Sequence, residues 1–299
     1  MKILNFGSLN IDYVYSVEHF VRGGETLASD RLELFPGGKG LNQSVAFAKA
    51  GAEVYHAGLV GAEDGLLLDT LRESGVDTRF VRSAEGTACG HAIIQVSKAG
   101  ENCILLYGGA NQHVTEDMID EVLAFFRAGD LLMLQNEING IGQILRKAHA
   151  KGMVTALNPS PFNGIISTLD FTALDYLILN ETEGRELTSK EAPEEILSCL
   201  LSRYPHLRVV LTLGSEGSVY ADGDRRVRQA IFPAKAVDTT AAGDTFTGYF
   251  FTALLGGEPP EAALRLASAA SSITVSRKGA APSIPTAEEV RGSGLIPFS

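Results

Sequence analysis

Cysteine is scarce in this sequence, and its few copies form no recognisable pattern. Cys89, Cys103 and Cys199 are the three cysteines among 299 residues, and none of them is part of a CxxC pair. An odd number at these spacings argues against a disulfide framework and against a structural zinc site. The sequence therefore indicates a protein of a reducing compartment, which we expect to be the cytoplasm.

Long hydrophobic runs are also missing. The longest apolar stretch covers residues 246–255 and is interrupted by Gly248. A membrane-spanning helix needs about 20 apolar residues, so this stretch is too short. The first seven residues are interrupted too early by polar residues to form a secretory signal. We therefore expect no membrane partner.

Basic residues are outnumbered by acidic ones. The chain has 25 Lys and Arg against 36 Asp and Glu, which gives a formal net charge of −11. This charge repels a polyphosphate backbone and argues against a nucleic acid as partner. A local site of backbone amides and a metal ion can still hold ATP. Hydrophobic residues make up 45% and charged residues 20%, a balance that indicates a folded globular protein.

Short apolar runs rich in β-branched residues alternate with helical patterns through most of the sequence. This alternation predicts βαβ units around a largely parallel sheet. Strands are predicted at residues 3–6, 54–59, 131–135, 154–158, 176–180 and 209–213. Helices are predicted at residues 65–74, 116–127, 141–150 and 194–204. Several strands end in polar residues, as expected where parallel strands supply side chains to a site at their carboxyl ends.

Two stretches interrupt the alternation, at roughly residues 12–35 and 88–109. Both have β-strand character without an intervening helix, which predicts an antiparallel flap separate from the parallel sheet. We interpret the flap as a lid inserted into a single domain that covers residues 1–299; an ordinary edge hairpin is the alternative. Exposed strand edges and an apolar face are usually covered by pairing, so a homodimer formed through the lid is expected.

The most specific motif covers residues 238–246 and reads Asp-Thr-Thr-Ala-Ala-Gly-Asp-Thr-Phe. Ala241, Ala242 and Gly243 are small, and their N–H groups lie at the start of an apolar helix, where they can bind an anion. Asp244 lies beside this anion hole. A base is needed there to take the proton from a hydroxyl that attacks a phosphoryl group. A lone Asp at a helix start is more often a cap, but the complete motif favours the catalytic role.

A second motif covers residues 36–43 and reads Pro-Gly-Gly-Lys-Gly-Leu-Asn-Gln. It opens a predicted helix that ends near residue 50. No Ser or Thr follows the lysine, so the segment is not a phosphate loop, and it does not have the GxGxxG spacing of a dinucleotide site. The glycines allow close approach of a ligand, and Asn42 offers both a donor and an acceptor to a sugar. A tight turn before a helix would explain the segment alone equally well.

Further polar residues follow the predicted strands. Because parallel strands end at the same edge of a sheet, residues at these positions predict one shared crevice. They are Asn10, Asp12, Glu137, Asn180, Glu183, Thr212 and Gly214.

Together these motifs resemble the ribokinase-like family of carbohydrate and nucleoside kinases. The resemblance runs from Gly-Ser-Leu-Asn-Ile-Asp at residues 7–12, through the Gly-Gly-Lys-Gly segment, to Ser-Arg-Lys-Gly-Ala-Ala-Pro-Ser at residues 276–283. It implies an α/β fold with a predominantly parallel central sheet flanked by helices, and a small antiparallel β lid. It also implies an ATP-dependent kinase that phosphorylates a sugar hydroxyl, with Asp244 as the base.

The resemblance assigns individual residues to four sites. It implies a sugar site formed by Asn10, Asp12, Gly38, Lys39, Asn42, Glu137 and Asp244. The anion hole would consist of the amides of Ala241, Ala242 and Gly243. The ATP site would contain Asn180, Glu183, Thr212, Gly214, Gly243 and Ser268, with Glu183 binding Mg²⁺ through water. A monovalent-cation site for K⁺ would contain Asp238, Thr240, Thr274, Arg277, Gly279 and Ser283.

The acceptor sugar is expected to be D-ribose, phosphorylated at O5, because the polar residues of the sugar site suit a bare polyol. Fructose, 2-keto-3-deoxygluconate and a nucleoside are the alternatives. A nucleoside would need an apolar platform for its base, and a keto acid would need a cationic partner such as Arg22 or Arg31. A non-catalytic sugar sensor is a further alternative, which the retained Asp244 disfavours. A nicotinamide dehydrogenase is disfavoured by the missing dinucleotide motif.

Overall fold

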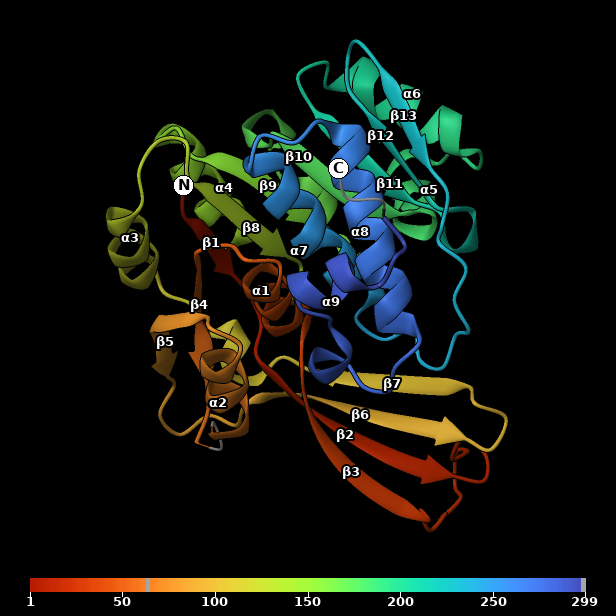
Figure 1. Cartoon of the computed structure of the whole chain (residues 1–299). Coiled ribbons are helices and arrows are strands. Elements are labelled where there is room, and N and C mark those ends of the chain that lie inside the picture. Colours follow the sequence, from red (N-terminus) through yellow and green to blue (C-terminus); the bar gives the residue numbers. More distant parts are fainter. Residues whose placement is uncertain (63–64, 297–299) are drawn as a thin grey trace.

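The main element of the computed structural model is a nine-stranded sheet with the strand order β13-β12-β11-β10-β9-β8-β1-β4-β5 (Figure 1). The structure describes residues 1–62 and 65–296. The part of the sheet that runs β11-β10-β9-β8-β1-β4-β5 is parallel throughout. The strands β12 and β13 are added antiparallel at the β11 edge. The strands are β1 (Ile3–Phe6), β4 (Val54–Val60), β5 (Asp77–Ser83), β8 (Leu131–Gln135), β9 (Val154–Asn158), β10 (Tyr176–Asn180), β11 (Arg208–Thr212), β12 (Ser218–Ala221) and β13 (Arg226–Gln229).

The central strands are covered by helices. Every residue of β1, β4 and β8 is buried, which is why these strands are almost continuously apolar in sequence. The cluster of buried side chains on one side includes residues of α3, α4 and α6, and the other cluster includes residues of α1, α7 and α8. The helices are α1 (Lys39–Lys49), α2 (Gly65–Glu73), α3 (Glu116–Phe125), α4 (Ile141–Ala150), α5 (Glu181–Thr188), α6 (Pro193–Arg203), α7 (Ala242–Leu255), α8 (Pro260–Val275) and α9 (Ala287–Gly292).

This architecture confirms the predicted fold class, a mostly parallel sheet flanked by helices. Four of the predicted strands, at residues 3–6, 131–135, 154–158 and 176–180, have the predicted bounds. Among the helices that the structure describes, none is both long enough and apolar enough to cross a membrane.

A second sheet of four strands, which we call the lid, projects from the lower edge of the body in Figure 1. It consists of β2 (Asn10–Val17), β3 (Arg31–Gly37), β6 (Gly90–Ser97) and β7 (Asn102–Tyr107). The β2–β3 and β6–β7 pairs are antiparallel, but the central β2–β6 pair is parallel. Both central strands leave the body from neighbouring points, where Asn10 pairs with Gly90. The lid is therefore two antiparallel hairpins joined side by side.

Candidate active site

The helix α7 begins with a backbone arrangement that leaves amide groups open. Ala241, its N-cap residue, has a φ of 61°, in the left-handed region. The amides of Gly243 and Asp244 donate to no backbone carbonyl of the described residues, whereas the amide of Ala242 lies 3.3 Å from the carbonyl oxygen of Thr239. A Cβ atom at Gly243 would have no neighbour within 4 Å. Unpaired amides at an open helix start can bind an anion.

Asp244 lies in the first turn of α7 and is only 7% exposed. Its two carboxylate oxygens accept hydrogen bonds from two consecutive side chains of α1. Asn42 Nδ2 lies 3.2 Å from Oδ2, and Gln43 Nε2 lies 2.9 Å from Oδ1. The carboxylate is therefore fixed in orientation by amide donors, next to the open amides at the start of its own helix.

Glu137, one of the predicted sugar-site residues, follows β8 and contacts the first residue of α1. Its Oε2 accepts the backbone N–H of Lys39 at 2.9 Å and also the hydroxyl of Ser8. The same hydroxyl accepts the amide of Gly40 at 3.1 Å. Ser8 was not predicted as a site residue, although it lies in the motif at residues 7–12. It connects the end of β1 to both α1 and Glu137.

Asn10 and Asn42 place amide groups in the same region. Asn10 Oδ1 accepts from Asn111 Nδ2 at 2.7 Å, and the Oδ1 of Asn111 accepts the N–H of Leu9 at 3.0 Å. Asn111 is thus a buried support that the sequence did not reveal. The Oδ1 of Asn42 is buried without a hydrogen-bond partner among the described residues. A buried acceptor of this kind needs a donor, which a bound ligand can provide.

Two glycines allow these side chains to come together. A Cβ atom at Gly37 would overlap the carboxylate of Asp12. Gly38 has a φ of 89°, and a Cβ there would lie 3.1 Å from the backbone nitrogen of Asn10. A side chain at either position would therefore displace β2 from the start of α1.

Negative charge predominates in this cluster. Burial lowers the pKa of Lys39, but the charges of Asp244, Glu137 and Glu183 outweigh burial and raise it. Burial, with a contribution from the charge of Glu137, raises the pKa of Asp12 to about 7. Burial also raises the pKa of Glu137, against the opposing effect of Lys39 and Ser8. Ligand hydroxyl groups that donate to these carboxylates would stabilise their ionised forms.

The predicted nucleotide residues lie at the ends of the next strands. Asn180 caps α5 by accepting the N–H of Glu183 at 2.9 Å, and Oε2 of Glu183 accepts the N–H of Asn180 at 3.0 Å. Thr212 pairs with Asn180 in the β10–β11 register, and Gly214 follows with a left-handed φ of 54°. The charge of Glu183 also acts on Lys39, so these residues border the sugar-site cluster.

Ser268 lies on a different element, α8, from the other predicted nucleotide residues. It is buried on α8, and its carbonyl oxygen accepts the hydroxyl of Ser272 at 2.9 Å. In the described part of the chain, no hydrogen bond joins the Ser268 side chain to Asn180, Glu183 or Thr212.

The predicted cation-site residues come from two segments, one before α7 and one after α8. Asp238 joins them, because its Oδ1 accepts the N–H of Thr240 at 2.9 Å and its Oδ2 accepts the N–H of Gly279 at 3.0 Å. Burial raises the pKa of Asp238, but these hydrogen bonds outweigh it and lower the pKa. The hydroxyl of Thr274 lies 3.0 Å from that of Thr245 on α7.

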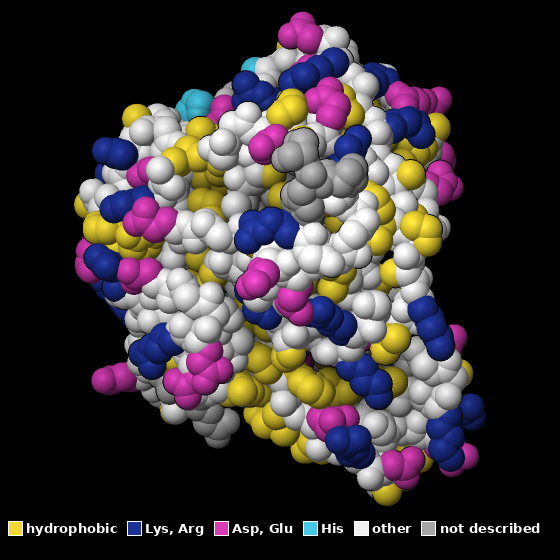
Figure 2. Space-filling model, viewed as in Figure 1, with side chains coloured by type: hydrophobic (Ala, Val, Ile, Leu, Met, Phe, Trp, Pro, Cys, Tyr) yellow, Lys and Arg dark blue, Asp and Glu magenta, His cyan; other side chains and the backbone are white. Residues whose placement is uncertain are grey.

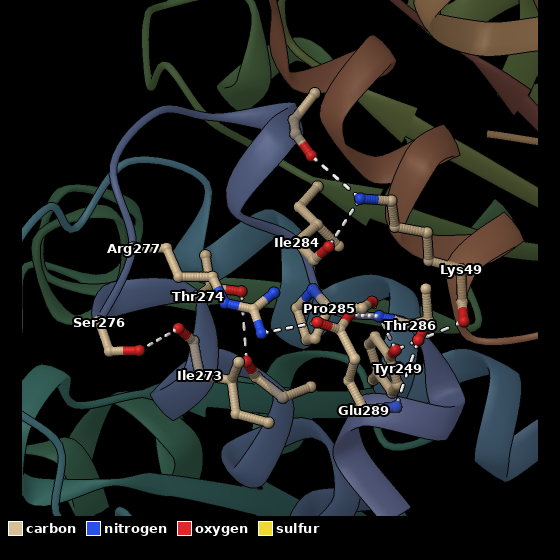
Figure 3. Close-up of polar contacts among 12 residues, drawn as sticks. Lys49, Tyr249, Ile273, Thr274, Ser276, Arg277, Ile284, Pro285, Thr286 and Glu289 are labelled. Carbon is tan, nitrogen blue, oxygen red and sulfur yellow. Dashed lines mark hydrogen bonds and ion pairs between the residues drawn. The ribbon is translucent and has the colours of Figure 1, made fainter. Parts of the chain in front are cut away.

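Residues 276–286, which we call the C-terminal loop, accept hydrogen bonds from side chains of α1 and α7 (Figure 3). Lys49, the last residue of α1, donates to the carbonyl of Ile284 at 2.7 Å, and the hydroxyl of Tyr249 donates to the carbonyl of Pro285 at 2.8 Å. Arg277 forms an ion pair of 2.7 Å with Glu289 of α9. Ser283 is buried within the loop. The start of α7 and this loop therefore belong to one connected framework.

Comparison with known proteins agrees with this geometry. Residues 1–287 match the family model described as pfkB family carbohydrate kinase. A ribokinase from Haemophilus influenzae is 36% identical over 292 residues, covering 95% of each chain, and a ribokinase from Bacillus subtilis is 34% identical, covering 97% of this chain and 98% of the relative. A solved structure of Arabidopsis thaliana ribokinase, complexed with ribose and ATP, superimposes with a TM-score of 0.88 at 32% identity, covering 100% of this chain and 99% of that one.

Proposed function

The chain belongs to the pfkB family of carbohydrate kinases, and we propose that it transfers the γ-phosphoryl group of ATP to the O5 hydroxyl of D-ribose. The observation that carries this proposal is the position of Asp244, a buried carboxylate held between two amide donors and next to unpaired helix amides. The names of the relatives, and the ribose and ATP of the Arabidopsis complex, support the choice of both substrates.

In the proposed reaction Asp244 acts as the general base. It takes the proton of the O5 hydroxyl while O5 forms a bond to the γ-phosphorus, and the bond from that phosphorus to the bridging oxygen of ADP breaks. Negative charge on the transferred group faces the start of α7. There the amides of Ala241, Ala242 and Gly243 form the proposed anion hole, for which the Ala242 amide would have to release the carbonyl oxygen of Thr239.

The sugar hydroxyls would be bound by Asn10, Asp12, Asn42 and Glu137. Asp12 and Glu137 are acceptors that burial makes costly to ionise, so each gains from a hydroxyl donor. The Oδ1 of Asn42 supplies one more acceptor that the described residues leave unused. A ligand without a matching hydroxyl would leave a buried acceptor unpaired at a cost of about 1–3 kcal/mol, which favours a bare pentose.

The nucleotide would bind along the ends of β10 and β11, at Asn180, Thr212 and Gly214, with Ser268 on its outer side. Mg²⁺ would arrive with the phosphates and neutralise part of their charge. Within the described ranges no three His, Cys, Asp or Glu side chains are placed to hold a metal ion. This arrangement fits Mg²⁺, which commonly keeps its waters and binds phosphates plus one or two carboxylates. Glu183 would hold it through water.

A K⁺ ion would bind between Asp238 and the C-terminal loop. The carbonyl oxygens of Thr240, Gly279 and Ser283 accept no hydrogen bond from the described residues, so they are available as ligands. Thr274 and Arg277 complete the proposed site. A bound cation would supply positive charge that holds the two segments together, and Asp238 already aligns them.

A second copy of the chain is proposed to cover the lid. Strand alternation gives both faces of the lid apolar side chains, with Leu105 and Tyr107 on one face and Ile104 and Leu106 on the other. Leu105 is 67% exposed and Tyr107 53% exposed. Figure 2 shows hydrophobic side chains gathered over the lid. Exposed apolar strands with free edges are usually covered by pairing, which supports a homodimer formed through the lid.

The supply of ATP and the cysteine pattern support a cytoplasmic location.

The substrate is tested by measuring ADP release with four acceptors: D-ribose, fructose, adenosine and 2-keto-3-deoxygluconate. We expect the highest kcat/KM with D-ribose and a product phosphorylated at O5, identified by NMR. A tenfold preference for any of the other three would overturn the ribose assignment while leaving the kinase assignment intact.

A further inference from the structure

A chain of buried polar side chains leads from Asp244 to the interior of the sheet. Its members are Gln43, Gln135, Asn5, Ser44 and His56, and the side chains of all five are fully buried. Gln43 Nε2 donates to Asp244, and Gln43 Oε1 accepts from Gln135 Nε2 at 2.7 Å. The proposed substrates do not require these residues. Burying a polar side chain costs free energy unless it is hydrogen-bonded. Buried polar side chains that bind no ligand therefore need a structural explanation.

The hydrogen bonds from Asp244 through Gln43 and Gln135 to Asn5 have only one possible direction. An ionised carboxylate only accepts, so Gln43 must present its NH₂ group to Asp244 and its oxygen to Gln135. Gln135 Nε2 also donates to Asn5 Oδ1 at 2.8 Å, which uses its second hydrogen. Each amide is therefore oriented by the next one, and a flip of either glutamine would put two acceptors or two donors face to face.

The far end of the polar chain is fixed in the same sense. Asn5 Nδ2 donates to the carbonyl of Gly40 and to the hydroxyl of Ser44, both at 2.7 Å. The Ser44 hydroxyl also forms a hydrogen bond of 2.8 Å with His56 Nδ1. Burial lowers the pKa of His56 to about 3, so the imidazole stays neutral at physiological pH.

We propose that Gln43 is a positioning residue for the Asp244 base, and that Gln135, Asn5, Ser44 and His56 hold the Gln43 amide in the orientation that donates to this carboxylate. The inference rests on the proposed role of Asp244 as base. With Oδ1 held by Gln43, the carboxylate cannot rotate, and its remaining lone pairs stay directed at the incoming hydroxyl. A general base must be held in this way for efficient proton transfer.

Other charged groups also act on Asp244. They are Lys39 of α1 and Glu137 after β8, and Glu183 of α5 faces Lys39 from the nucleotide side. All of them remain in place in the variants proposed below. Asp12 of β2, which titrates in the same cluster, is also unchanged in Gln43→Met, so a difference in pH dependence between this variant and the parent reports the Gln43 contact.

The test compares kcat, KM and thermal stability of Gln43→Met across pH 5–9, with D-ribose or with whichever acceptor the substrate panel selects. Met has nearly the same shape and cannot donate. We expect kcat to fall about 10- to 100-fold, as for loss of a hydrogen bond to a charged group, with little change in KM. The acidic limb of the kcat profile should move to higher pH, because loss of a donor raises the pKa of a carboxylate.

Two variants at Gln135 separate orientation from simple packing. Gln135→Glu places an acceptor against Gln43 Oε1 and favours a flip that turns this oxygen toward Asp244, whereas Gln135→Met only removes the bond. We expect Gln135→Glu to have the lower kcat when the two are compared at equal thermal stability. If Gln43→Met does not fold, the comparison of Gln135→Glu with Gln135→Met tests the proposed orientation of Gln43 in its place.

Thr155→Val is the matched control for loss of a buried polar contact. Thr155 is fully buried in β9 and donates to the carbonyl of Ala173, outside the polar chain. It should lower the melting temperature without moving the acidic limb. If Gln43→Met kept the parental pH profile, or lost activity only in proportion to stability, Gln43 would be a structural residue. Near-parental turnover by Asp244→Asn would instead contradict the proposed base itself.

Discussion

Gly248 of α7 packs directly on Ala46 of α1, and a Cβ atom at Gly248 would lie only 2.5 Å from the Cβ of Ala46. The two helices carry opposite parts of the candidate site, since the first turn of α7 contains the proposed base Asp244 and the start of α1 contains Lys39, Asn42 and Gln43. Their separation at Gly248 therefore sets how closely Asn42 and Gln43 approach Asp244.

Gly248→Ala should push the two helices apart. Overpacking of a close contact typically costs about 1–3 kcal/mol in the free energy of unfolding, and we expect kcat to fall as well because the base loses its donors. Chemical denaturation and initial rates check both effects. Gly292→Ala, at the end of α9, is the control, because a Cβ there would meet nothing within 4 Å. Equal stability of the two variants would contradict this account of the helix contact.

Asp244→Asn keeps the shape of the side chain and removes the proton acceptor. We expect kcat to fall about 100-fold or more. ATP binding, measured by calorimetry, should persist because the amides at the start of α7 remain. Loss of nucleotide binding together with kcat would show that Asp244 acts in binding rather than as the base.

Asp12 should make the stability of the ligand-free protein depend on pH. Its folded-state pKa of about 7 lies above the ordinary value of 3.8, so the folded state binds the proton more tightly than the unfolded state does. The free energy of unfolding should then decrease as pH rises from about 4 to about 7. Asp12→Asn should raise the melting temperature at pH 8 more than at pH 4. An equal change at both pH values would contradict the raised pKa.

Ionisation of Asp12 should strengthen sugar binding, although it lowers the free energy of unfolding. Asp12 must be ionised to accept two hydroxyl groups, so KM for the sugar should increase as pH falls below about 7. Glu137 titrates in the same cluster, so the comparison with Asp12→Asn identifies the contribution of Asp12.

Exchange of Na⁺ for K⁺ at constant ionic strength should raise activity and the melting temperature. The proposed ion joins the segment before α7 to the C-terminal loop, which orders the anion hole without touching ATP. Asp238→Ala removes the carboxylate that bonds Thr240 and Gly279, and it should abolish both responses. Identical rates and melting temperatures of the parent in the two salts would rule out the cation site.

Leu105→Asp should convert the proposed dimer into a monomer. Leu105 lies on β7 of the lid, where a second copy would have to bury the new charge. Light scattering coupled to gel filtration, at micromolar concentration, measures the mass. Leu66→Asp is the control, since Leu66 is also exposed but lies on α2. A monomeric parent, or a dimer that survives Leu105→Asp, would exclude this interface.

The parallel strands could be predicted because their signal is local. The strands at residues 131–135 and 176–180 are short apolar runs buried on both faces, and their bounds agree with the prediction. The prediction missed β5, in which Phe80 and Val81 are the only apolar residues, and the β12–β13 hairpin at the sheet edge. The parallel β2–β6 pair was also missed, because residues about 80 apart in sequence give no local indication of their register.

The candidate site was predictable where residues cluster in motifs. Asn42 and Asp244 were each predicted from their own segment, and the structure places them 3.2 Å apart across 202 residues of sequence. Gln43 lies in the same motif, but no role could be predicted for it, because its partner Gln135 is 92 residues away. The available signal was a glutamine that ends an otherwise apolar buried strand.

The position of Lys49 at the end of α1 has a thermodynamic consequence. This helix is about 16 Å long, with Lys39 of the proposed sugar site at its first position and the C-terminal loop bonded to its last. If an ion that orders the loop increases affinity for the sugar, linkage requires the sugar to increase affinity for the ion by the same factor. Through the helix, sugar binding at its first residue would then change ion affinity at its last, and ion binding would change sugar affinity.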